Sequence, residues 1–210
     1  MSFWSSLSAR FYDATMRGLE RSCLSQWRPE LIGDLEGDVL EIGSGTGANL
    51  AYYPESVSRL VLSEPDRQMR KQLLKKVDRL GRGSFSVADY AAESMPFESG
   101  SFDAVVATLV LCSVHSQRAA LSEIRRVLKP GGLLVFLEHV TAREQPGLAR
   151  WQRRIQPVWV RVCGNCHLTR DTEKAILDSG FEFVQIERGR MPGAPAIVSP
   201  MIKGRVRRGS

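Results

Sequence analysis

A short glycine-rich segment directly after an apolar run constrains this chain more than any other feature. Residues 39–42 read Val-Leu-Glu-Ile, and glycines follow at alternate positions as Gly43, Gly45 and Gly47. Glycine lets the backbone turn sharply and lets a ligand approach it closely at the carboxyl edge of a parallel sheet. The segment therefore predicts the first strand of an α/β domain, a loop that opens a helix, and a nucleotide-like ligand beside that loop.

Beyond this segment, apolar runs alternate with stretches of helical periodicity. This alternation is typical of βαβ units and predicts a Rossmann-like, doubly wound α/β fold with a mostly parallel seven-stranded sheet and helices on both faces. The turn sequence Lys-Pro-Gly-Gly at 129–132 is expected to end a helix. Expected strands are 39–42, 59–63, 85–87, 102–111, 133–137, 181–186 and 197–206, and expected helices are 66–80, 117–128, 146–163 and 172–179.

Length and composition favour one domain. The 210 residues, 43% of them hydrophobic, are enough for one buried core, so a single domain over 1–210 is expected. Within it, 1–30 is expected to form an N-terminal helical lid and 146–165 a helical insertion over the acceptor site. No apolar run reaches the roughly 18–20 residues that cross a bilayer, which favours a cytoplasmic protein.

Charge and cysteine content point to few special features. The four cysteines are too few and too scattered for a disulfide framework, so reduced thiols are expected. Much of the formal net charge of +6 lies in one basic tail, which is expected to be solvated. The tail comprises Lys203, Arg205, Arg207 and Arg208.

An acidic residue on the second expected strand supports the ligand assignment. Glu64 ends that strand about twenty residues after the loop, where a carboxylate can accept hydrogen bonds from both hydroxyls of a ribose. Gly43-x-Gly45-x-x-Ala48 also satisfies the dinucleotide pattern, so an NAD enzyme is an alternative. The alternate glycines after an acidic strand residue, Asn49 after the loop, and the turn before the fifth strand oppose that alternative.

Together these features resemble class I methyltransferases that depend on S-adenosylmethionine (AdoMet), over most of the chain. The resemblance implies AdoMet as cofactor and S-adenosylhomocysteine as product. In that family the loop contacts the methionine part, the acid after the second strand holds the ribose, and the segment after the third strand holds adenine. Tyr12 resembles a residue that closes over the cofactor, with packing alone as its alternative. The implied cofactor residues are Glu41, Gly43, Ser44, Gly45, Gly47, Asn49, Glu64, Pro65, Ala92, Glu93, Thr108 and Leu109.

Several stretches are similar to one subgroup, the alkyl-thiol S-methyltransferases of the methyltransferase-like type-seven family. They are 45–49 with the Tyr-Pro pair at 53–54, then 108–114, 138–140 and 166–170. Two departures stand out. The animal enzymes begin with a hydrophobic membrane segment that is missing here, and they carry aspartate where this chain has Glu64. Peripheral membrane contact is therefore not the favoured expectation.

The resemblance implies a small-molecule acceptor, with S-methylation of a thiol as the leading chemistry. Methylation of an apolar quinone-like or lipid-like acceptor at C, O or N is the alternative, and a non-catalytic AdoMet-binding module is a further one. His139, expected at the carboxyl end of the fifth strand, is the first candidate for a general base. A histidine that only caps the strand end is its alternative. His115 and His167 are weaker candidates because each is expected in a turn or loop.

Two further patterns are weighed and not favoured. Cys163 and Cys166 have the spacing of half a zinc site, but no second ligand pair appears in the sequence, so no metal is expected. Trp151 and the arginines around it suggest stacking and phosphate contacts with nucleic acid. The apolar spacing of Trp151, Ile155, Val158 and Val162 instead favours an amphipathic helix whose apolar face lines an acceptor pocket, with contact at a membrane surface or packing alone as alternatives.

Overall fold

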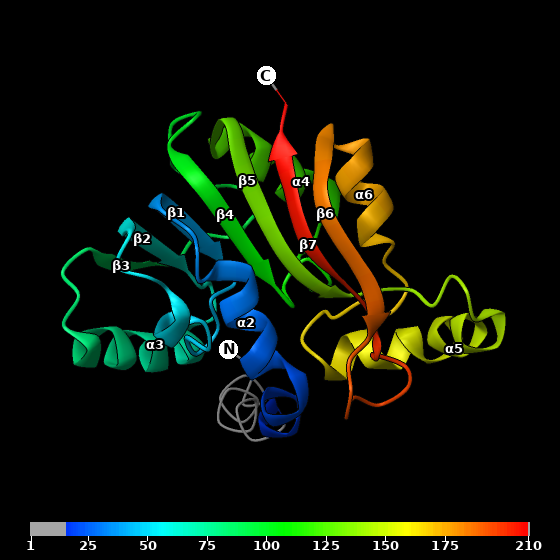
Figure 1. Cartoon of the computed structure of the whole chain (residues 1–210). Helices are drawn as coiled ribbons and strands as arrows, with labels where there is room; N and C mark the ends of the chain where they lie inside the picture. The colour runs from blue at the N-terminus through cyan, green and yellow to red at the C-terminus, as the bar shows by residue number, and fades with distance from the viewer. Residues whose placement is uncertain (1–15, 210) are drawn as a thin grey trace.

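The structure of the chain is a computed structural model that describes residues 16–209. Its seven strands form one sheet in the order β3-β2-β1-β4-β5-β7-β6 (Figure 1). The first five strands run parallel, and β7 is antiparallel to both of its neighbours. The predicted fold class is therefore confirmed. The strands are β1 (Gly37–Ile42), β2 (Val57–Ser63), β3 (Phe85–Ala88), β4 (Phe102–Thr108), β5 (Leu128–His139), β6 (Phe181–Arg190) and β7 (Pro200–Arg208).

Helices cover both faces of the sheet (Figure 1). On one face, Leu73 and Val77 of α3 belong to a buried cluster with Leu62 of β2. On the other face, Leu121 and Ile124 of α4 belong to a second buried cluster that contains the β4 and β5 side chains. The helical elements are η1 (Glu20–Leu24), α2 (Ser25–Ile32), η2 (Leu50–Tyr52), α3 (Arg67–Leu80), α4 (Gln117–Val127), α5 (Pro146–Val162) and α6 (Thr172–Asp178).

Local sequence signals explain where the crossover helices begin and end. The Asp66 carboxylate accepts hydrogen bonds from the backbone N–H groups of Gln68 and Met69 at the start of α3. The helix ends at Gly81, whose φ of 62° lies in the left-handed region. Ser116 caps α4 in the same way, through the N–H of Ala119. The helices predicted over 66–80 and 117–128 are therefore confirmed to within a residue or two.

The region after the glycine loop differs from the prediction. No α-helix opens there, because residues 45–49 form turns and only the short 3₁₀ helix η2 follows. Pro54 ends η2, since a proline disfavours the helical conformation in the residue before it. Tyr53 accordingly adopts an extended backbone with ψ of 125°.

Four strand boundaries differ from the prediction by three residues or more, and one of them is the end of β6, at Arg190 instead of 186. β5 begins at Leu128, so residues 129–132 enter the strand through a register shift against β4 instead of forming a separate turn. β4 ends at Thr108, earlier than predicted, because Leu109 has a φ of 57° and cannot continue the strand. β7 begins at Pro200 instead of 197.

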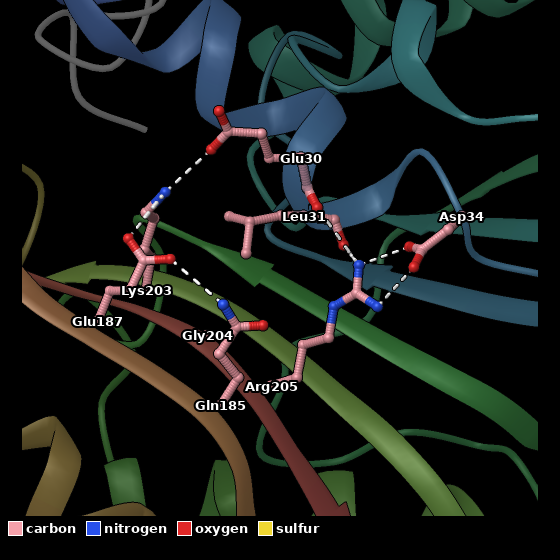
Figure 2. A pocket seen from close by; sticks show the side chains of 8 residues that line it. All are labelled: Glu30, Leu31, Asp34, Gln185, Glu187, Lys203, Gly204 and Arg205. Atoms are coloured by element: carbon pink, nitrogen blue, oxygen red, sulfur yellow. Dashed lines mark hydrogen bonds and ion pairs between the residues drawn. The ribbon is translucent and has the colours of Figure 1, made fainter.

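The basic tail forms part of β7. The expectation that it is simply solvated is therefore wrong. Lys203 Nζ lies 3.0 Å from Glu30 Oε2 of α2 and 3.2 Å from Glu187 Oε2 of β6. Arg205 pairs with Asp34 beside the same helix. Figure 2 shows these side chains around a pocket of about 210 Å³ between α2 and the last two strands. Because the charges pair with one another, we interpret this pocket as the place where α2 is attached to the sheet.

Across residues 16–209, none of the helices combines the length and the apolar character that a membrane span requires.

Candidate active site

The glycine loop leaves β1 at the edge where the parallel strands end, and its conformation requires glycine. Gly43 and Gly45 have φ values of 58° and 56°, a region that other residues rarely adopt. A side chain at Gly43 would clash with Val110, which follows β4. A Cβ atom at Gly45 would meet no atom within 4 Å, so the backbone there is open to a ligand. Ser44 between them is buried and donates its N–H to the Ser63 carbonyl at 3.0 Å.

Glu64 joins the end of β2 to this loop. Its Oε2 atom accepts a hydrogen bond from the Gly45 N–H at 2.8 Å, and its Oε1 atom accepts one from the Asp66 N–H at 2.8 Å. Burial raises the pKa of Glu64 above its ordinary value. The loop and this acid therefore lie side by side, and the contact of Glu64 with a ribose stays a prediction. Pro65 lies between Glu64 and the cap of α3.

The end of β4 supplies the third wall of the site. Leu109 has a left-handed φ of 57°, which is unusual for a residue other than glycine and is found most often at functional sites. Its N–H donates to the Leu137 carbonyl at 2.7 Å, which fixes the turn against β5. The Thr108 hydroxyl accepts a hydrogen bond from the Asn49 side chain at 3.1 Å. The turn is thus held from both sides at the position predicted for cofactor contact.

Two of the predicted cofactor residues are buried behind the loop. The Glu41 carboxylate accepts a hydrogen bond from the Tyr53 hydroxyl at 2.5 Å, and burial raises the pKa of Glu41 to about 7. The Asn49 side chain accepts a hydrogen bond from Arg28 at 2.6 Å, and Arg28 is itself paired with Glu20. Both residues therefore support the loop from within, and contact with the cofactor stays a prediction for them.

Arg28 was missed by sequence reasoning. It lies in the expected N-terminal lid, where an arginine on a helix is ordinarily solvated, so its burial had no local signal.

The segment after β3 has a clear structural role. Ala92 is buried within a small turn closed by an isolated bridge between Ala91 and Ser94. The Glu93 carboxylate accepts hydrogen bonds from the backbone N–H groups of His115 at 2.6 Å and Ser116 at 3.2 Å, just before α4. Glu93 therefore ties the adenine segment to the start of α4, and its contact with adenine stays a prediction.

His139 lies at the last position of β5, as predicted, and is buried. Its Nε2 atom is 3.0 Å from Cys166 Sγ, and the Trp159 indole donates to the same sulfur at 3.3 Å. Its Nδ1 atom has no hydrogen-bond partner among the described residues. Cys112 lies close enough to complete a group of two thiols and one imidazole.

The pKa values of the two thiols in this group are shifted in opposite directions. Hydrogen bonds from Cys112 and then His139 lower the pKa of the Cys166 thiol, whereas the contact with Cys166 and burial raise the pKa of Cys112. The predicted base thus already has a sulfur partner, which no sequence pattern indicated because the three residues come from separate segments.

The side chains of the remaining candidates do not belong to this group. The His115 side chain is exposed, and His167 contacts Gln156 of α5 at 2.8 Å. Cys163 is half-buried and does not join the cluster. Tyr12 lies outside the described residues.

The side of α5 that packs against the domain is not its apolar side. Gln152 is fully buried and bonds to the Ala142 N–H and to the Val140 and Ile197 carbonyls. The predicted apolar face is exposed instead, with Trp151 59% and Val162 74% accessible. Polar side chains of α5 thus satisfy the backbone groups around it, and a role of the apolar face in lining an acceptor pocket stays a prediction.

The residues present fit AdoMet. An open glycine backbone, a buried carboxylate that retains further lone pairs for the hydroxyls of a ribose, and a strained turn at Leu109 meet at one strand edge. Fold and site together define a class I AdoMet-dependent methyltransferase. The family model described as "Methyltransferase domain" matches residues 40–136, which include the loop, Glu64 and the end of β4.

Sequence identity to known proteins shows which family the chain belongs to. The chain is 39% identical over 207 residues to rat (Rattus norvegicus) thiol S-methyltransferase TMT1B, covering 95% of this chain and 82% of the relative. It is 38% identical over 170 residues to human (Homo sapiens) thiol S-methyltransferase TMT1A, covering 79% and 68%. The chain therefore belongs to the thiol S-methyltransferase family. A solved geranyl diphosphate methyltransferase in complex with SAM shares the fold, with a TM-score of 0.71 at 15% identity over 94% of this chain and 90% of the other.

Proposed function

We propose that this chain transfers the methyl group of AdoMet to the sulfur of a small thiol. The observation that carries the proposal is its 39% identity to a thiol S-methyltransferase over 95% of the chain. That stretch includes the glycine loop and Glu64, which the 2.8 Å hydrogen bond from Gly45 joins into one site. The acceptor class comes from the relatives, and the cofactor-binding arrangement supports the methyl donor.

The main task of the chain's own residues is to position the cofactor. AdoMet, when bound, supplies a methyl group already activated on a positive sulfur. Glu64 would hold the ribose hydroxyls, while the glycine loop and the turn at Leu109 would hold the amino-acid part and exclude water. A thiol with a pKa of about 8.5 is a few per cent ionised at neutral pH, so little base assistance is needed. The assignment of His139 as a base stays a prediction.

An acceptor panel tests the proposal. Purified chain is incubated with AdoMet labelled in its methyl group and with thiols, phenols, amines and a reduced quinone, and methylated products are identified by mass spectrometry. We expect label on the sulfur of one or more thiols. Transfer to the quinone or phenols alone would contradict the thiol assignment. Transfer to no acceptor, with AdoMet still bound, would favour a non-catalytic binding module.

A cytoplasmic location, the two helical coverings at 1–30 and 146–165, and the absence of a nucleic-acid partner stay predictions. The paired charges of Lys203 and Arg205 support the last of these, because those cations are already neutralised by carboxylates of the same chain.

A further inference from the structure

Two thiols and an imidazole from three separate segments meet at the carboxyl edge of the sheet. Cys112 follows β4, His139 ends β5, and Cys166 follows α5. One imidazole nitrogen of His139 and the two Sγ atoms all lie within 4.8 Å of one another. Cys112 and His139 are buried, and Cys166 is half-buried. This group lies outside the residues assigned to AdoMet.

Backbone hydrogen bonds hold the three ligand segments in place. The Glu138 carboxylate accepts the N–H groups of Val110 and Leu111 at 2.9 Å each and that of Cys112 at 3.2 Å. The His167 N–H donates to the Cys112 carbonyl at 2.9 Å, which joins the segment of Cys166 to that of Cys112. The cluster is therefore built into the fold and does not arise from mobile side chains.

The spacing suits a zinc ion. Zinc lies about 2.3 Å from a thiolate sulfur and about 2.0–2.1 Å from an imidazole nitrogen, so ligand atoms around it are roughly 3.5–3.8 Å apart. The three ligand atoms lie within 4.8 Å of one another, so small side-chain movements would bring them to these distances. The 3.0 Å separation of His139 Nε2 and Cys166 Sγ is a hydrogen-bond length, which an ion would replace with two coordinate bonds.

The ligand types of this group favour one kind of ion. Thiolate and imidazole ligands favour zinc over magnesium or calcium, and two thiolates neutralise its charge.

We propose that Cys112, His139 and Cys166 bind one Zn²⁺ ion and leave its fourth position open. Three protein ligands with an open position are typical of catalytic zinc sites. The open position suits the acceptor thiol, whose sulfur binds as the thiolate while its proton passes to solvent. This last step rests on the proposed function. It also replaces the base role of His139, because an imidazole that coordinates the ion is no longer free to take the acceptor's proton.

Metal uptake by the full chain tests the site without any turnover. The purified protein is treated with a reductant and a chelator, then titrated with Zn²⁺ and separately with Co²⁺. We expect one ion per chain, and for Co²⁺ a thiolate-to-metal absorption band in the near ultraviolet. Cys112→Ser and Cys166→Ser should each lose stoichiometric uptake and most of that band. Cys163→Ser, a neighbouring cysteine outside the cluster, should keep both.

AdoMet binding by each variant separates loss of a ligand from loss of the fold. Absence of metal uptake by the reduced parent chain would overturn the site, as would a Cys166→Ser variant that binds the ion as the parent does. Addition of 2-mercaptoethanol to the Co²⁺ form should strengthen the thiolate band, and an unchanged spectrum would overturn the open position. Ion uptake without methyl transfer to any thiol would contradict the proposed function and leave the metal site standing.

Discussion

The sequence assigns Glu41 and Glu64 to the same site, but the structure gives the two buried carboxylates different partners. Glu64 reaches the loop backbone at 2.8 Å, where a ribose would be held. Glu41, one strand away, turns inward to Tyr53 and has its pKa raised to about 7 by burial. We therefore predict that Glu64 binds the ligand and that Glu41 supports the loop, and substitutions should distinguish the two roles.

Glu64→Ala should weaken AdoMet binding by about 1.5–3 kcal/mol, the range for hydrogen bonds to a charged group. Equilibrium dialysis with labelled AdoMet measures this effect. Glu98→Ala serves as the matched control, because Glu98 is exposed and is not among the residues assigned to the cofactor. Equal AdoMet affinity in Glu64→Ala and the parent chain would remove Glu64 from the site.

Glu41→Gln should change how stability depends on pH. The pKa of Glu41 is about 7 in the folded chain and about 4.3 when unfolded, so the folded state holds an extra proton between these values. Its stabilising contribution is present at the lower pH and is lost as the pH rises through 7, by up to about 4 kcal/mol. Glutamine still accepts from Tyr53 and does not ionise. Denaturant unfolding at about pH 5 and about pH 8 gives the free energy of unfolding at each pH. Between the two, the variant should lose less of this free energy than the parent chain, and equal losses would refute the raised pKa of Glu41.

Among the elements, the crossover helices were the most predictable and the strand ends at the site the least. Asp66 and Gly81 bracket α3 through capping, a signal contained within the local sequence. The left-handed turn at Leu109 has no such signal, because it depends on the carbonyl of Leu137 in the next strand. Helix α5 was predicted at the right residues, but the burial of its Gln152 side chain was not predicted, since that burial depends on distant backbone groups.

Gln152→Ala should loosen α5 selectively. The substitution leaves the Ala142 N–H and the Val140 and Ile197 carbonyls without their side-chain partner, at a cost of about 1–3 kcal/mol for each group left unsatisfied. Hydrogen exchange should quicken along α5 and in these loops, while β1 and β4 keep their protection. Arg153→Ala, an exposed position on the same helix, is the control. Protection of α5 that matches the parent would show that Gln152 does not hold the helix.

At the scale of the whole molecule, the site is assembled from segments that only the complete sheet brings together. The glycine loop and Glu64 lie on neighbouring strands of a recognisable motif, so sequence reasoning found them. Cys112, His139 and Cys166 come from three segments, and their meeting depends on strand order and on the path of the chain after α5. Clusters of this kind are apparent only once the fold is known.

Because several segments share the cofactor site, AdoMet should stabilise the entire domain. At a concentration 100 times its Kd, a ligand that binds only the folded chain raises the free energy of unfolding by about 2.7 kcal/mol. Thermal unfolding with and without AdoMet measures the gain. The midpoint of Glu64→Ala should rise less at the same AdoMet concentration. A parent chain whose midpoint is unaffected by saturating AdoMet would indicate that the site does not span these segments.

The central claim is that the loop after β1 and the carboxylate after β2 hold a sulfonium nucleoside. Calorimetric titration of the parent chain with S-adenosylhomocysteine, and separately with NAD, tests it most directly. The account predicts saturable binding of one S-adenosylhomocysteine per chain and no heat with NAD. A clear isotherm with NAD and none with S-adenosylhomocysteine would contradict it.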